Sequence, residues 1–156
     1  LYRFAPVKIE EILRDLFTAH DDLISRKNLT VDFDVPENLP TVQADRTRIQ
    51  FALQIVFENS LIYTPEKGKI GIKARQVGGE VVLSFKDNGI GISLDDMEHI
   101  FSKFYRATPA RHTDTEGMGI GLYMAKNIVE KHRGKIWVES RGEGNGAEFT
   151  ITLPVG

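Results

Sequence analysis

The sequence predicts an α+β fold: a two-layer sandwich in which a mixed, mainly antiparallel sheet of about five strands carries three main helices on one face. Several segments alternate apolar and polar residues, as strands with one solvent-facing side do. Three longer segments repeat apolar residues at helical spacing. The chain has 156 residues, of which 41% are hydrophobic, enough for one compact core, so we expect residues 1–156 to form a single domain.

The N-terminal third predicts a strand, a helix, a second strand and a second helix. Tyr2–Val7 is extended in character, and Lys8–Lys27 has the apolar spacing of one amphipathic helix. Leu29–Val35 alternates and predicts a strand. Asp45 suits the N-cap of a helix that runs to Tyr63. This helix is apolar nearly all round, so we expect it to be buried on most sides.

The rest of the chain predicts a hairpin, two helices and a final pair of strands. Gly78-Gly79 is a turn signal between two alternating segments, Lys69–Arg75 and Val81–Phe85. Ser93 is a suitable cap for a short helix. The remaining predicted elements are that short helix at Ser93–Ile100, a helix at Gly121–Lys131, and strands at Lys135–Ser140 and Ala147–Leu153.

Composition excludes several classes of function. The net charge is −2 with acids and bases interleaved, which removes the general electrostatic case for binding nucleic acid. The chain has no cysteine, which excludes disulfides and thiolate metal sites. No run approaches the roughly 18 apolar residues of a membrane span, so we expect no direct membrane insertion by this domain.

Two glycine clusters are the strongest candidates for a ligand site. D-N-G-I-G-I at residues 87–92 ends a predicted strand, and G-M-G-I-G-L at residues 117–122 opens a predicted helix. A carboxylate such as Asp87 can accept a hydrogen bond from an exocyclic amine, and a helix N-terminus can bind phosphate. The second cluster has no strand directly upstream and no G-K-[ST], so it matches neither common phosphate loop. Either cluster alone is also typical of an ordinary tight turn.

Asn59 is a polar residue in the apolar helix before Tyr63. Its side-chain oxygen suits a hard cation such as Mg²⁺ if phosphates lie nearby, and a hydrogen-bonded core amide is the structural alternative. The neighbouring Glu58 is a candidate ligand or base, or simply an exposed carboxylate at the rim.

Four motifs in order resemble those of one family. They are N-S-L-I-Y-T-P at 59–65, D-N-G-I-G-I at 87–92, I-F-S-K-F-Y-R at 100–106 and G-M-G-I-G-L-Y-M-A-K at 117–126. This series resembles the N, G1, F and G2 boxes of sensor histidine kinases, in the catalytic ATP-binding domain of the Bergerat, or GHKL, fold. D-R-T-R-I-Q at 45–50 and the C-terminal segment are similar to that family too, so the resemblance covers essentially the whole chain.

The resemblance implies ATP and Mg²⁺ as ligands. Asp87 would hydrogen-bond the adenine amino group, Asn59 would coordinate Mg²⁺, and Tyr63 would stack near the adenine. A lid at about residues 93–116 would close over the nucleotide. The other implied residues are Gly89 and Gly91 at the base, Gly117, Gly119, Gly121 and Leu122 at the phosphate side, Phe101 and Phe104 anchoring the lid, Arg106 reaching the phosphates for catalysis, and Arg111 as a weaker candidate.

Two positions depart from the family pattern. Ile55 stands where the family often has Asn, and Ile62 stands where it often has Lys. Residues 55, 59 and 62 share one helix face, so two of three polar groups on the nucleotide-facing side are replaced by apolar ones. One lost charge-assisted contact typically costs about 1.5–3 kcal/mol, so we expect weaker ATP affinity or slower phosphoryl transfer than in a standard member.

The resemblance implies transfer of the ATP γ-phosphoryl group to a histidine on a separate helical dimerisation and phosphoacceptor domain, with a response regulator downstream. We find no such acceptor motif in the chain, so we expect it to bind nucleotide without phosphorylating itself. It would be a cytoplasmic part of a longer sensor kinase, membrane-anchored or not. The alternatives are a catalytically weak, nucleotide-gated interaction module, another GHKL ATPase, and a serine kinase of this fold.

Overall fold

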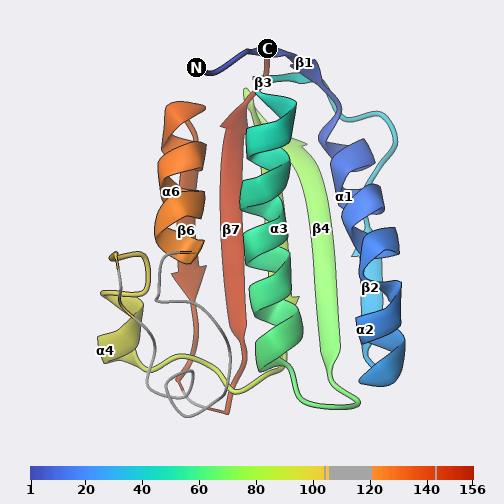
Figure 1. The fold of residues 1–156 in the computed structure, drawn as a ribbon, viewed down its shortest axis with the longest axis vertical. Coiled ribbons are helices and arrows are strands. Elements are labelled where there is room, and N and C mark those ends of the chain that lie inside the picture. The colour runs from blue at the N-terminus through green and yellow to red at the C-terminus, as the bar shows by residue number, and fades with distance from the viewer. Residues whose placement is uncertain (104, 106–120, 143) are drawn as a thin grey trace.

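A computed structural model describes residues 1–103, 105, 121–142 and 144–156 (Figure 1). Its main sheet has five strands in the order β2-β4-β5-β7-β6. The β2–β4 pair is parallel and the other three pairs are antiparallel, which confirms the predicted mixed sheet and α+β class. The strands are β2 (Thr30–Asp34), β4 (Lys69–Val77), β5 (Glu80–Asp87), β7 (Ala147–Pro154) and β6 (Lys135–Glu139).

Three helices cover one face of this sheet, as predicted (Figure 1). They are α1 (Ile9–Ala19), α3 (Arg46–Tyr63) and α6 (Gly121–Lys131). Helix α3 lies in the middle and places Leu53 and Phe57, both fully buried, against the sheet. The Phe57 and Phe85 rings lie 6.3 Å apart, which joins α3 to the centre of β5.

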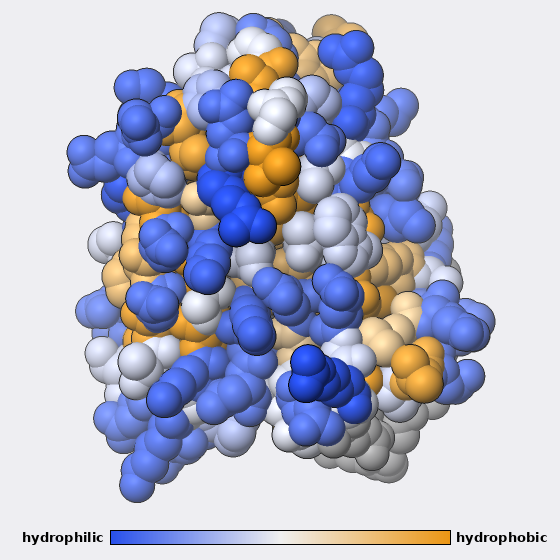
Figure 2. All heavy atoms as spheres, turned by 180° about the vertical axis from the view of Figure 1, so that it is seen from behind, coloured by the Kyte–Doolittle hydropathy of each residue, from blue (hydrophilic) through white to orange (hydrophobic). Residues whose placement is uncertain are grey.

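The opposite face of the sheet meets solvent, as the alternating pattern predicts. Seen from behind in Figure 2, it carries many hydrophilic side chains. Among them are Lys69, Lys73 and Lys86, which alternate with buried residues along β4 and β5. The hairpin between these strands turns at Gly78, whose φ is +60°, as the Gly78-Gly79 pair predicts.

The predicted helix at Lys8–Lys27 is two helices, α1 and α2 (Asp21–Arg26), separated at His20. The His20 ring binds the Leu16 carbonyl through Nδ1 at 2.8 Å and Glu58 of α3 through Nε2 at 2.8 Å. Both helices bury apolar residues in the same core, so the apolar spacing continues across the break between them. At this break His20 contacts α3.

Three further predictions need correction. Helix α3 is not buried on most sides, because Phe51 and Ile62 are 44% and 37% exposed on the side that its neighbours leave open. The sequence pattern missed β3 (Val42–Ala44), a strand too short to alternate visibly, which pairs with β1 (Ala5–Val7). The short helix is α4 (Leu94–Met97), half the predicted length, although Ser93 caps it by accepting from the Asp96 N–H at 3.1 Å.

In the part of the chain that the structure describes, no helix is both long enough and apolar enough to cross a membrane.

Candidate functional site

The end of β5 is bonded to two segments that are distant in sequence. The Ile90 N–H donates to the Tyr63 carbonyl at the end of α3 (3.2 Å). From the other side, the Gly146 and Gly144 N–H groups donate to the carbonyls of Gly89 (3.1 Å) and Ile90 (2.5 Å). Residues 87–91 therefore form a backbone seam, held between the end of α3 and the loop at 140–146.

This seam leaves no room for side chains at the predicted glycines. A Cβ on Gly89 would lie 2.3 Å from the Tyr63 carbonyl oxygen. Gly91 has a φ of +74°, and its Cβ would lie 2.1 Å from the Gly142 carbonyl oxygen. Both distances are below any real Cβ contact, so the close approach explains why glycine occupies these positions.

Asp87 is a buried carboxylate next to this seam. Its side chain is 8% exposed and its Oδ1 accepts the Gly89 N–H at 2.8 Å. Burial raises the pKa of Asp87, while hydrogen bonds from the N–H groups of Gly89 and Ala147 act in the opposite direction. A carboxylate in this setting is a strong acceptor for a donor that approaches along the seam.

Asn59 and Tyr63 lie one helical turn apart at the end of α3. Asn59 is half-buried, and its side chain makes no hydrogen bond to any residue that the structure describes. Its amide oxygen is therefore available to a ligand, which fits the donor type that Mg²⁺ prefers. Tyr63 is partly buried against the core, and its carbonyl is tied to the seam.

The start of α6 lies beside the same side of α3. A Cβ on Gly121 would be 3.4 Å from the Ile55 Cγ2 atom, an ordinary contact distance. Leu122 is 8% exposed and belongs to the core, while Ile62 is half-exposed at the surface. The structure thus brings Gly121 to the helix face that carries Ile55 and Asn59.

Of the predicted lid at about residues 93–116, the structure describes residues 93–103 and 105. The Phe101 ring meets the Phe149 ring of β7 edge-on at 6.2 Å, and the Lys126 ammonium of α6 lies 5.9 Å from the centre of the Phe101 ring. Phe101 therefore contacts β7 and α6, and its role as a lid anchor stays a prediction. Five predicted residues lie outside the described residues: Phe104, Arg106, Arg111, Gly117 and Gly119.

Two further side chains, Glu58 and Ser140, take part in contacts that the sequence did not predict. Glu58 Oε2 binds His20 Nε2 at 2.8 Å and Gln54 Nε2 at 3.0 Å, so it is directed toward the α1–α2 junction. Ser140 was not predicted: its Oγ accepts from the Ile92 N–H (3.0 Å) and donates to the Gly146 carbonyl (2.6 Å). A serine directly before a glycine-rich loop was the only local signal for this role.

A distinct hollow of about 370 Å³ opens on the solvent face of the sheet, between Lys69, Lys73 and Lys86. Asp87 lines its edge, but the Asp87 carboxylate is buried, whereas the exposed Lys86 before it points to the other face. This hollow is therefore separate from the site formed by α3, β5 and α6.

A family model described as histidine kinase-, DNA gyrase B- and HSP90-like ATPase matches residues 44–156. The chain belongs to this family. It is 35% identical over 96% of its length to the adaptive-response sensory kinase SasA of Synechocystis, of which it covers 39%. The chain thus spans well under half of that curated relative.

Solved structures narrow the assignment to the catalytic domain of sensor histidine kinases. The catalytic domain of the histidine kinase ThkA matches with a TM-score of 0.85 and 30% identity, covering 98% of both chains. Full-length ShkA in complex with AMPPNP matches with a TM-score of 0.83 and 28% identity, over 99% of this chain and 31% of that one. ThkA in complex with the response regulator TrrA matches with a TM-score of 0.80 and 29% identity, over 98% of this chain and 42% of that one.

We expect Gly89→Ala to lower the free energy of unfolding by more than about 1 kcal/mol, since its methyl group cannot coexist with the Tyr63 carbonyl. Gly79→Ala is the matched control, because a Cβ there meets nothing within 4 Å and φ is not in the left-handed region. Urea unfolding of both variants measures the difference. Equal stability of the two would show that the seam tolerates a side chain.

Proposed function

We propose that this domain binds Mg-ATP at the seam and donates the γ-phosphoryl group to a histidine on a separate helical dimerisation and phosphoacceptor domain. The observation that carries this proposal is the buried Asp87 carboxylate beside Gly89 and Gly91, with Asn59 and Gly121 nearby. The similarity to a full-length kinase in complex with AMPPNP supports it.

Each residue would have a separate task. Asp87 accepts a hydrogen bond from the adenine amino group, and Gly89 and Gly91 keep the base-side roles that the resemblance implies. Asn59 would hold Mg²⁺ through its amide oxygen. When bound, the cation neutralises charge on the phosphates. Arg106, Gly117 and Gly119 keep the roles that the resemblance implies, at the phosphates and the lid hinge.

The chain's contribution to the reaction is positioning. The seam, α3 and α6 would hold the two ends of the nucleotide at a fixed separation. The γ-phosphoryl group would then meet the acceptor histidine in a fixed orientation, which favours the reaction. The acceptor domain would be part of the same longer protein, and a response regulator would receive the phosphoryl group. The complex of ThkA with TrrA supports a response regulator as the partner.

A second candidate is a nucleotide-gated interaction module with little catalysis, favoured by the apolar Ile55 and Ile62 beside Asn59. Addition of the separate helical domain with labelled ATP discriminates the two. Phosphohistidine on that domain supports the kinase, whereas ATP binding without transfer supports the module.

Calorimetry with ATP and ADP, with and without Mg²⁺, tests the site itself. We expect Asp87→Asn to abolish nucleotide binding, because the amide replaces a charged acceptor and brings a competing donor. We expect Asn59→Ala to remove the Mg²⁺ dependence of binding while weaker nucleotide binding remains. Unchanged binding in both variants would refute the site assignment.

ATP binding should weaken on acidification at a pH above the ordinary range of aspartate. Burial raises the pKa of Asp87 above its usual 3.8; below the raised pKa the carboxyl group is protonated and loses its charge-assisted bond. That bond is worth about 1.5–3 kcal/mol, or ten- to hundredfold in affinity.

Inosine triphosphate is the control for this titration, because it has the same phosphates but lacks the adenine amino group. Binding should be followed by calorimetry from neutral pH downward for both nucleotides. The steeper loss should belong to ATP, and parallel curves for the two nucleotides would contradict the role of Asp87.

Restoring a cation on the open side of α3 should raise ATP affinity. Ile62 is 37% exposed, so Ile62→Lys costs little burial, and we expect about tenfold tighter binding or more. Phe51→Lys is the control: it adds the same charge to the same helix at a position that is 44% exposed and eleven residues away. Calorimetry compares the two variants; equal gains would mean that only net charge acts.

A further inference from the structure

The hollow of about 370 Å³ on the solvent face of the sheet has features that the nucleotide site does not explain. It lies on the face that Figure 2 shows, away from the helices. Its volume falls within the range of small-molecule sites, which is about 300–1,000 Å³. One of its lining residues is Gly71, which lies inside β4 and has no side chain to fill the space.

Neither backbone conformation nor close packing against the described residues requires glycine at residue 71. A Cβ there would meet only the Lys86 carbonyl oxygen, at 4.0 Å, and φ is not in the left-handed region. By contrast, a Cβ on Gly89 or Gly91 would lie 2.3 or 2.1 Å from a backbone oxygen. Glycine inside a strand makes the folding equilibrium about two- to fivefold less favourable than alanine does. Such a glycine often marks a place where a ligand approaches the backbone.

Four charged side chains surround the open space above Gly71. Lys69 and Lys73 are two residues before and after it in β4, so they lie on the same face of the sheet. Lys86 of β5 and Asp32 of β2 are its partners on the two neighbouring strands. All four are exposed and line the hollow. Neighbouring strands lie about 5 Å apart and residues two apart in a strand about 7 Å, so the three ammonium groups can reach one ligand.

These three lysines have no ionic partner in the part of the chain that the structure describes. No carboxylate there lies within 4.0 Å of their ammonium groups, although Asp32 is close by in the sheet. The other carboxylate that faces the hollow, Glu148, is engaged by Ser84, whose Oγ donates to Glu148 Oε2 at 2.5 Å. The hollow therefore has three free ammonium groups on one side and one free carboxylate on the other.

We propose that this hollow binds a phosphate monoester that carries hydroxyl groups, such as a sugar phosphate. The phosphate lies over Gly71, where the three lysines supply one point charge for each of three phosphate oxygens. The hydroxyl groups face β2, where Asp32 accepts hydrogen bonds from them and the Thr30 hydroxyl donates or accepts. Inorganic phosphate leaves Asp32 unpaired next to an anion, so the ester binds more tightly than the bare ion.

The Gly71→Val variant tests whether the glycine serves a ligand. Valine favours a strand and its side chain fills the hollow. Gly71→Val should therefore unfold at a higher urea concentration than the unmodified chain, and it should no longer bind the sugar phosphate. Unfolding at a lower urea concentration would show that the fold itself needs glycine, and retained binding would show that the hollow is not the site. Either result would overturn the proposal.

Binding can be measured on the whole chain from the nuclear magnetic resonance signal of the residue 71 amide, which reports on this hollow and not on the seam. The probes are ribose 5-phosphate, inorganic phosphate and ribose, each titrated at constant ionic strength. Ribose 5-phosphate should shift the signal at the lowest concentration, inorganic phosphate only at higher concentration, and ribose not at all. Equal responses to the two anions would mean that the lysines attract any anion and would refute the site.

Two lysine variants separate local contacts from net charge. Lys86→Met should weaken the binding of ribose 5-phosphate by up to about fivefold, the contribution of one exposed charge pair. Lys135→Met is the matched control, because it removes the same charge from β6 on the same face without lining the hollow. An equal loss in both variants would assign the effect to net charge and contradict the proposal.

This site does not depend on the proposed nucleotide function, and the two can fail separately. Lys86 and Asp87 are consecutive in β5 and point to opposite faces of the sheet. The Asn59→Ala variant should therefore leave the ribose 5-phosphate titration unchanged, and Gly71→Val should leave ATP binding unchanged. Loss of sugar phosphate binding in Asn59→Ala would place the ligand at the nucleotide site instead.

Discussion

The close approach of three backbone segments at residues 87–91 is the constraint on which the candidate site depends. A Cβ on Gly146 would lie 2.0 Å from the Asp87 carbonyl oxygen, just as one on Gly89 would meet the Tyr63 carbonyl. The seam therefore excludes side chains from both directions. The packing of backbone against backbone therefore accounts for the glycines beside the buried Asp87 carboxylate.

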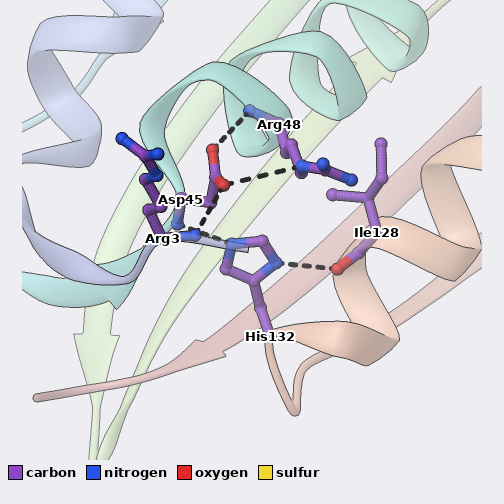
Figure 3. Close-up of polar contacts among 5 residues, drawn as sticks. All are labelled: Arg3, Asp45, Arg48, Ile128 and His132. Atoms are coloured by element: carbon purple, nitrogen blue, oxygen red, sulfur yellow. Dashed lines mark hydrogen bonds and ion pairs between the residues drawn. The ribbon is translucent and has the colours of Figure 1, made fainter. Parts of the chain in front are cut away.

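Helix α3 is fixed in position along its axis because side chains from other segments bond both of its ends. At its start, His132, which follows α6, accepts the Asp45 N–H through Nε2 at 3.0 Å (Figure 3). At its end, the Lys27 ammonium donates to the Leu61 carbonyl at 2.6 Å, and burial lowers the pKa of this lysine. A cation is favourable at a helix C-terminus, where the carbonyls lack partners within the helix. Sliding α3 along its axis would break bonds at both ends, so Asn59 stays in register with Asp87.

Features encoded by neighbouring residues could be predicted from the sequence. The strands of the β4–β5 hairpin, the Asp45 cap and the glycine clusters follow rules that span a few residues. Features that depend on distant partners could not. The break at His20 accompanies a contact with Glu58, and β3 gains its pairing from β1. The exposed side of α3 depends on where α1 and α6 lie, which the apolar run from Ile49 to Ile62 does not reveal.

The same distinction holds within the site. The order of four motifs made Asp87, Asn59 and Tyr63 candidates, because their separation along the chain is itself a signal. Ser140 and His132 were missed because each acts through backbone groups far away in sequence: Ser140 on Ile92, and His132 on Asp45. A side chain that serves as a backbone partner leaves no periodic pattern and no motif. Its role becomes visible only when the fold has brought the two segments together.

The two apolar substitutions on α3 are not equivalent, and the structure explains why. Ile55 lies at contact distance from the position of a Gly121 side chain, so it contributes packing where α6 begins, and a polar replacement would disturb that packing. Ile62 is over a third exposed and contributes little burial. In the proposed site, a missing phosphate contact would cost about 1.5–3 kcal/mol at either position, but only at Ile55 would apolar packing offset the loss. Under the proposed function, nucleotide affinity would therefore change at residue 62 without a change in the fold, whereas residue 55 would couple affinity to the placement of α6.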